Sequence, residues 1–182
     1  MQVCMLFCDG FEDIEALAVV DILRRANVNI DLIGVENETV ESSSRVIIKM
    51  ERTLREVTKK NRIYDMVILP GGGLGTANLE RSADVRDFIL KHVEFKKKIA
   101  AICAAPRVLA GLGLLKGKKA TCYPSVKEAL HDSTYVDAPV VVDGNFITSR
   151  GPATACAFGF KILEEIGMLE ASRECQEKML FG

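Results

Sequence analysis

The sequence predicts an α/β fold, a three-layer sandwich in which helices cover both faces of a mainly parallel sheet. Short, almost wholly apolar runs alternate with amphipathic segments, as buried parallel strands and their crossover helices do. One run, residues 99–102, is followed by Cys103, small residues and Pro106, which indicates a strand-to-helix elbow. The chain of 182 residues is 48% hydrophobic and 27% charged, so we expect one domain over residues 1–182.

The first 69 residues contain four apolar runs that we interpret as strands: residues 2–7, 29–35, 45–50 and 64–69. The third is expected at a sheet edge or in a small excursion. Residues 13–26 repeat apolar side chains at helical spacing after an acidic turn, which predicts a helix. The stretch 36–44 is expected to be a polar connection without its own element, and 51–62 a charged segment with few apolar anchors.

Further helices and strands follow at similar intervals. We expect strands over 99–102 and 120–123, and a tight hairpin from 140–142 and 146–148 joined by Asp143, Gly144 and Asn145. The expected helices are residues 78–94, 106–112, 125–130, 153–166 and the tail 170–182. Ser125 is placed to cap the third of these.

Charge and cysteine usage exclude several classes of function. The net charge of −1 and pI near 6.2 lack the basic excess of a nucleic-acid-binding protein. No apolar stretch approaches the roughly 20 residues of a membrane span, and the chain opens directly into a strand rather than a leader. The six cysteines form no Cys-x-x-Cys pair and no metal-ligand spacing. We therefore expect a cytoplasmic protein without a metal.

A glycine-rich loop follows the strand at 64–69. Gly71, Gly72, Gly73 and Gly75 let the backbone approach another group closely. The loop lacks the Gly-Lys-Ser/Thr ending of a phosphate loop, and Asn78 stands where a dinucleotide fingerprint has its third glycine. A structural turn and a set of oxyanion donors both remain open.

Cys103 and Glu15 are the candidate reactive residues. A thiol at a helix N-terminus meets free backbone N–H groups that favour thiolate, although a cysteine in an apolar run is more often a small core residue. Glu15 interrupts an apolar helix face, and its alternative is an ordinary exposed glutamate. Both lie after strand ends that meet at one sheet edge. The two histidines, His92 and His131, are expected to be solvated.

Four ordered motifs carry a resemblance to a known family: residues 10–15 (GFEDIE), 69–72 (LPGG), 101–106 (AICAAP) and 148–152 (TSRGP). Together they resemble the ThiJ/PfpI superfamily, in the branch of the Parkinson-disease-associated protein deglycase and bacterial YajL. The resemblance covers essentially the whole chain. It implies a flavodoxin-like sandwich, a homodimer, and Cys103 as the reactive cysteine of a nucleophile elbow.

The resemblance also implies roles for further residues. Glu15 would be protonated and hydrogen-bonded to the sulfur, and Gly72 and Ala104 would offer backbone N–H groups. The remaining matched positions would border the site or a dimer interface: Arg25, Arg45, Tyr123, Arg150 and Pro152. A helix end and a protonated acid would together lower the pKa of the thiol.

Two departures from the family pattern narrow the chemistry. Ala104 follows the cysteine where some members have histidine, and Tyr123 replaces a nearby family histidine. A cysteine peptidase would therefore lack its base. The resemblance implies cofactor-independent action on α-oxoaldehydes or early glycation adducts, of the glyoxalase or deglycase type. The alternatives are a redox sensor whose Cys103 is oxidised by peroxide to sulfinate, and a chaperone-like holdase.

Overall fold

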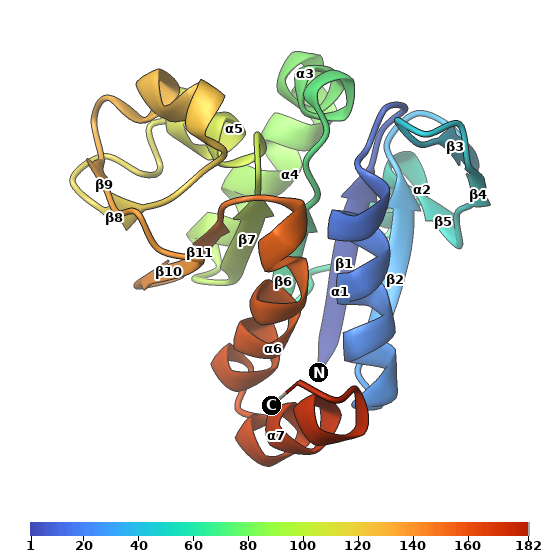
Figure 1. Cartoon of the computed structure of the whole chain (residues 1–182). Coiled ribbons are helices and arrows are strands. Elements are labelled where there is room, and N and C mark those ends of the chain that lie inside the picture. Colours follow the sequence, from blue (N-terminus) through green and yellow to red (C-terminus); the bar gives the residue numbers. More distant parts are fainter. Residues whose placement is uncertain (182) are drawn as a thin grey trace.

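The computed structural model describes residues 1–181 and contains a seven-stranded sheet with helices on both faces. Figure 1 shows the sheet between its two helical layers, which confirms the predicted α/β sandwich. The strand order is β10-β11-β7-β6-β1-β2-β5. All neighbours run parallel except β10 and β11, which form the predicted hairpin. The strands are β1 (Gln2–Phe7), β2 (Asn29–Gly34), β5 (Arg52–Thr53), β6 (Met66–Leu69), β7 (Lys98–Ile102), β10 (Val140–Asp143) and β11 (Phe146–Ser149).

The helices divide between the two faces of the sheet. One face packs against α1 (Asp13–Arg25), α6 (Ala155–Glu165) and α7 (Leu169–Lys178). The other packs against α2 (Leu54–Lys59), α3 (Gly73–Arg81), α4 (Ala83–Glu94) and α5 (Pro106–Gly111). Because alternate side chains of a strand point to opposite faces, a strand covered on both sides must be apolar throughout. This is why β1 reads as a continuous apolar run.

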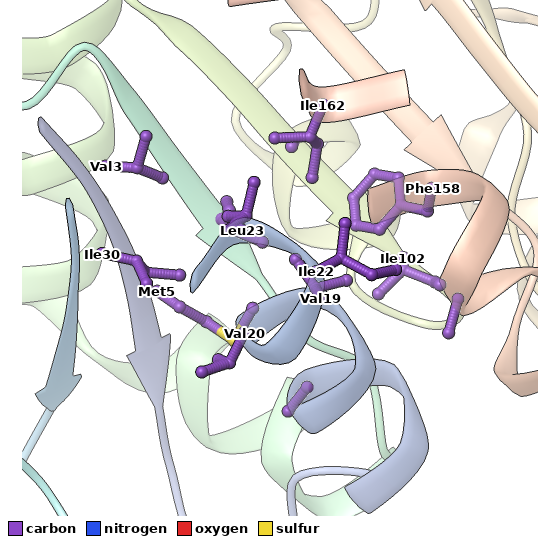
Figure 2. Close-up of a cluster of buried hydrophobic side chains, with 14 of the residues drawn as sticks. Val3, Met5, Val19, Val20, Ile22, Leu23, Ile30, Ile102, Phe158 and Ile162 are labelled. Carbon is purple, nitrogen blue, oxygen red and sulfur yellow. The ribbon is translucent and has the colours of Figure 1, made fainter. Parts of the chain in front are cut away.

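Helices α1 and α6 build the core of the first face. Figure 2 shows Val19, Val20, Ile22 and Leu23 of α1 among Val3, Met5, Ile30, Ile102, Phe158 and Ile162. Gly159 of α6 allows close packing here, since a Cβ at this position would lie 2.9 Å from Cδ1 of Ile22. The tight contact between α1 and α6 fixes where α1 begins, and hence where Glu15 stands.

Smaller elements lie near both edges of the sheet. The antiparallel pair β3 (Thr39–Glu41) and β4 (Ile47–Lys49) projects beside β2, and β8 (Lys119–Ala120) pairs with β9 (Thr134–Tyr135) beyond β11. Two short 3₁₀ helices, η1 (Pro124–Leu130) and η2 (Pro152–Thr154), complete the chain.

Five sequence predictions need correction. The connection 36–44 contains β3, and the segment 51–62 contains β5 and α2. The predicted helix 78–94 is two helices, α3 and α4. Ser82 is the N-cap of α4, and its hydroxyl oxygen accepts the Val85 N–H, so a new helix begins after Ser82. Ser125 caps nothing, since η1 starts at Pro124 without a side-chain cap. The predicted tail helix ends at Lys178, and Gly182 lies outside the described residues.

The strand order places a natural site between β1 and β6. The chain proceeds from β1 to β2 on one side, and then from β6 to β7 and β11 on the other. Ligands of open α/β sheets bind at such a reversal, beyond the carboxyl ends of the strands. The ends of β1, β6 and β7 lie together at the upper edge in Figure 1. Among residues 1–181, no helix combines the length and apolar character needed to cross a bilayer.

Candidate active site

Cys103 occupies the predicted elbow directly after β7. Its φ is +64°, a left-handed conformation that costs a non-glycine residue about 1–2 kcal/mol. Neighbouring segments hold this conformation from both sides. The Cys103 N–H donates to the carbonyl of Ser149 at 2.9 Å, and its carbonyl accepts the N–H of Tyr123 at 2.8 Å. The end of β11 and the segment before η1 therefore fix the direction of the thiol.

Glu15 lies in the first turn of α1 and is fully buried, whereas the neighbouring Ile14 is 56% exposed. The helix begins at the N-cap Glu12, whose carboxylate accepts the Glu15 N–H at 2.7 Å. Neither carboxylate oxygen of Glu15 has a hydrogen-bond partner of normal geometry within residues 1–181. Buried polar groups are almost always paired, so an unpaired carboxyl is costly and marks a functional position. The interpretation as an ordinary exposed glutamate is wrong.

Gly71 brings the two side chains together. A Cβ at this position would lie 2.2 Å from Oε2 of Glu15 and 2.5 Å from Cβ of Cys103. No other residue fits, because both groups pack on the bare backbone. Gly72 follows with φ +94°, and a Cβ there would approach the carbonyl oxygen of Gly10 to 2.3 Å. The glycine loop therefore allows the backbone to lie close to Glu15, Cys103 and Gly10.

The pKa values of Glu15 and Cys103 depend on each other. The pKa of Glu15 is raised to about 7 in total: burial raises it most and the Glu12 charge adds to this, while the Cys103 thiol and the Gly71 amide lower it. Burial also raises the pKa of Cys103 to about 12, and the Glu15 carboxylate contributes, against the amides of Gly72 and Ala104. The expectation of a lowered thiol pKa is therefore wrong, because the sulfur is buried beside an acid.

The consequence is a coupled pair. A thiolate beside a carboxylate would place two like charges in one buried site, which is unfavourable. A Cys103 thiolate is therefore favoured only when Glu15 is protonated, and transfer of the Cys103 proton to the Glu15 carboxylate satisfies this condition. The N–H groups of Gly72 and Ala104 favour the thiolate, and these are the two donors that the family resemblance implied.

Three of the named peripheral residues border a hollow of about 290 Å³ next to this pair. Tyr123, Arg150 and Pro152 line it. Gly151 separates it from the acid, since a Cβ there would lie 3.3 Å from the Tyr123 ring and 3.8 Å from Oε1 of Glu15. The structure thus brings these residues to the candidate site.

The two arginines have different positions. Arg25 pairs with Asp21 at 2.7 Å near the end of α1, ten residues and about 15 Å along the helix from Glu15, so this chain alone does not bring it to the site. Arg45, with φ +68°, lies in the turn between β3 and β4 and lines a separate hollow with Gly10 and Leu74. It borders the glycine loop rather than the thiol.

His92 is a further correction. We expected it to be solvated, but it is fully buried on α4. Its Nε2 accepts the Tyr64 N–H at 3.0 Å, and its Nδ1 lies 2.7 Å from the Phe88 carbonyl. Burial lowers its pKa. His131, in contrast, is exposed as expected.

Sequence reasoning expected close approach at Gly71 but did not identify the groups that it contacts, and it missed the role of Gly151. The available signal for both was a position between the end of a strand and the start of a helix. Within the part of the chain that the structure describes, no three His, Cys, Asp or Glu side chains are grouped to hold a metal ion.

Comparisons with known proteins identify related sequences and structures. The model of the DJ-1/PfpI family matches residues 1–165. The crystal structure of Drosophila melanogaster DJ-1beta superposes with a TM-score of 0.95 at 38% identity, over 100% of this chain and 98% of that one. A Schizosaccharomyces pombe protein named glutathione-independent glyoxalase DJ-1 is 35% identical over 91% of each chain. Arabidopsis thaliana DJ-1 homolog B is 38% identical over 90% of this chain, which spans only 37% of that protein.

Proposed function

The chain belongs to the DJ-1/PfpI family, and from that membership we propose that it converts small α-oxoaldehydes, or the early adducts they form, through Cys103 and Glu15 without a cofactor. The observation that carries this proposal is the buried, unpaired Glu15 carboxyl packed with Cys103 across Gly71. A general acid–base catalyst works best with a pKa near the working pH, and the pKa of Glu15 is raised to about 7. The glyoxalase name of the S. pombe relative supports the same chemistry.

The first step is addition of sulfur to the aldehyde carbon. The Cys103 proton passes to Glu15, the sulfur forms a bond to this carbon, and the carbonyl electron pair moves to oxygen. The N–H groups of Gly72 and Ala104 stabilise the negative oxygen. Glu15 then returns the proton to that oxygen, which gives a hemithioacetal and leaves Glu15 as the carboxylate.

The next steps move hydrogen within the substrate. Glu15 removes the hydrogen on the former aldehyde carbon and forms an enediolate with the adjacent carbonyl. It then protonates that second carbon, while the hydroxyl proton on the first carbon passes to the second oxygen, which leaves a thioester. Water cleaves the carbon–sulfur bond and releases a 2-hydroxy acid and the Cys103 thiol. One carbon is oxidised and its neighbour reduced, so no external oxidant is needed.

The experiment measures conversion of methylglyoxal to lactate by the wild type and by Cys103→Ser. We expect turnover to fall to the buffer rate in Cys103→Ser, because the hydroxyl is a much weaker nucleophile. The matched control is Cys156→Ser, which changes a half-buried thiol on α6 away from the site and should keep wild-type turnover. Turnover that persists in Cys103→Ser, or a wild type no faster than buffer, contradicts the proposal.

A second candidate function uses the same sulfur as a redox sensor. The observation that favours it is the pair of N–H groups from Gly72 and Ala104 directed at Cys103 beside a protonatable Glu15, which would stabilise a sulfinate. Two peroxide molecules would be reduced to water as the thiol becomes sulfinic acid. A wild type without turnover, but with Cys103 oxidised ahead of the other five cysteines in peptide mass mapping, favours the sensor. Equal oxidation of all six contradicts both functions.

We propose a second copy of the chain as the protein partner. Large apolar side chains that are about half or more exposed occur at the start of α1 and in the β3–β4 hairpin: Ile14, Val46 and Ile47. Ser44 donates to Asp13 at 2.8 Å, so these two segments lie side by side. Grouped exposed apolar side chains are typical of interfaces. Sedimentation equilibrium measures the assembly, and a monomer at micromolar concentration contradicts it.

A further inference from the structure

The hollow beside Tyr123 is bounded mainly by rigid apolar groups. Its lining is Tyr123, Pro124, Pro139, Arg150, Gly151, Pro152, Ala153 and Thr154. Three of these are prolines, whose backbone is restricted. Tyr123 itself is 45% exposed, so much of this side chain is open to solvent. An open apolar hollow with one aromatic wall suits an apolar or aromatic group of a small molecule.

Hydrogen bonds hold the floor of the hollow in place. The Ser149 hydroxyl donates to the Pro139 carbonyl at 2.8 Å and lies 2.7 Å from Oγ1 of Thr154. The Gly151 N–H donates to the same Thr154 oxygen at 3.1 Å. The hollow therefore exists before any ligand binds, and little ordering would accompany binding.

Charge at the rim is neutralised. The Arg150 guanidinium forms an ion pair with Asp137, and its backbone N–H donates to the Pro139 carbonyl at 3.3 Å. The rim thus offers no free cation for a carboxylate or phosphate substituent. An uncharged substituent fits this surface better than an anionic one.

The hollow lies beside the reactive pair. Gly151 alone separates the Tyr123 ring from Glu15, and the Tyr123 N–H donates to the Cys103 carbonyl. A substrate whose aldehyde carbon contacts the sulfur would therefore place the group on its second carbon beside the ring. From this geometry we propose that Tyr123 is a specificity-determining residue, and that the hollow selects α-oxoaldehydes with an aromatic or large apolar substituent. This inference rests on the proposed function.

The test compares kcat/KM for phenylglyoxal and methylglyoxal in the wild type, Tyr123→Ala and Tyr123→Phe. We expect the phenyl-to-methyl ratio to fall about tenfold or more in Tyr123→Ala, because removal of an aromatic wall takes away stacking and apolar contact. Tyr123→Phe should keep the ratio within about twofold, since the ring rather than the hydroxyl acts. A ratio unchanged in Tyr123→Ala, or reduced equally in both variants, overturns the proposal.

Two further measurements keep the result interpretable. Tyr135→Ala removes another tyrosine from the same region, outside the hollow, and should leave the ratio unchanged. A ratio of rates is also independent of the folded fraction. If Tyr123→Ala does not fold, Tyr123→Leu replaces it and should still lower the ratio.

Binding separates failure of this inference from failure of the proposed function. In Cys103→Ser, mandelate should bind at least tenfold more tightly than lactate by calorimetry, and the added Tyr123→Ala change should remove most of this difference. If mandelate and lactate bind Cys103→Ser with equal affinity, the inference is overturned, even when the wild type turns over both aldehydes. A mandelate preference that depends on Tyr123 supports the hollow even when neither aldehyde is turned over.

Discussion

Two buried carboxyl groups, Asp31 and Glu15, have opposite surroundings. Asp31 lies on β2 and is 6% exposed. Its Oδ2 accepts the Tyr64 hydroxyl at 2.7 Å and Nε of Arg52 at 2.9 Å, and Nη1 of Arg62 lies at 3.2 Å. Glu15 is fully buried, and neither of its oxygens has a hydrogen-bond partner of normal geometry within residues 1–181. Asp31 is surrounded by hydrogen-bond donors and cations, whereas Glu15 lacks them.

The difference separates a structural acid from a reactive one. Asp31 connects β2, β5 and the segment before β6, so its charge is compensated by groups that also hold the sheet together. Glu15 stands at the carboxyl edge, where burial raises its pKa to about 7 and keeps a proton available near neutral pH. Between these two acids, burial alone does not distinguish the reactive one, whereas the lack of compensating donors does.

The largest expected effect is on catalysis, in Glu15→Gln. The amide is nearly isosteric but cannot take or give the proton, so kcat/KM for methylglyoxal should fall about 10²- to 10⁴-fold. The measurement is lactate formation at pH 7, with near-UV circular dichroism to verify the fold. A loss smaller than about tenfold would assign proton transfer to water or the thiol and would erase the proposed distinction between the two acids.

Asp31→Asn should have the opposite effect, a loss of stability with little change in turnover. Removing this charge leaves Arg52 and Arg62 facing a neutral group in a mostly buried site, which should lower the free energy of unfolding by about 3 to 4 kcal/mol. Turnover per folded molecule should stay within about twofold of the wild type. Urea denaturation gives the stability, and active-site titration of Cys103 gives the folded fraction. A large loss of turnover without loss of stability contradicts the structural role.

The sequence predicted the apolar elements well for a physical reason. Strands buried on both faces must be apolar throughout, so β1, β2, β6 and β7 are visible as short uninterrupted runs. Elements held by polar caps were missed. Helix α2 depends on the reciprocal bonds of Thr53 and Glu56, which pass unnoticed when only apolar spacing is followed.

The candidate site was predictable in its members but not in its energetics. Cys103 and Glu15 follow from motif and position, yet the direction of the thiol pKa depends on how deeply the sulfur is buried. His92 was misjudged because its role depends on the Tyr64 amide, 28 residues away in the chain. Contacts between elements distant in sequence leave no local pattern to detect.

The smallest expected effect is the pH dependence of stability contributed by Glu15. Its pKa is raised from 4.5 to about 7 in the folded chain, so between these values the folded state keeps a proton that the unfolded state releases. Stability from this group is therefore complete below about pH 4.5 and is lost as the pH rises through 7. The total is up to about 3 kcal/mol.

Comparison with Glu15→Gln isolates this contribution. Burial lowers the pKa of His92, so that histidine acts in the opposite sense and reduces stability as the pH falls. It is present in both proteins and cancels in the difference. The unfolding free energy of the wild type relative to Glu15→Gln should thus decrease from pH 4.5 to 8, as measured by urea denaturation in steps of half a pH unit. A flat difference would mean that Glu15 gains partners in solution and resembles Asp31, which would remove the physical basis for calling one acid reactive and the other structural.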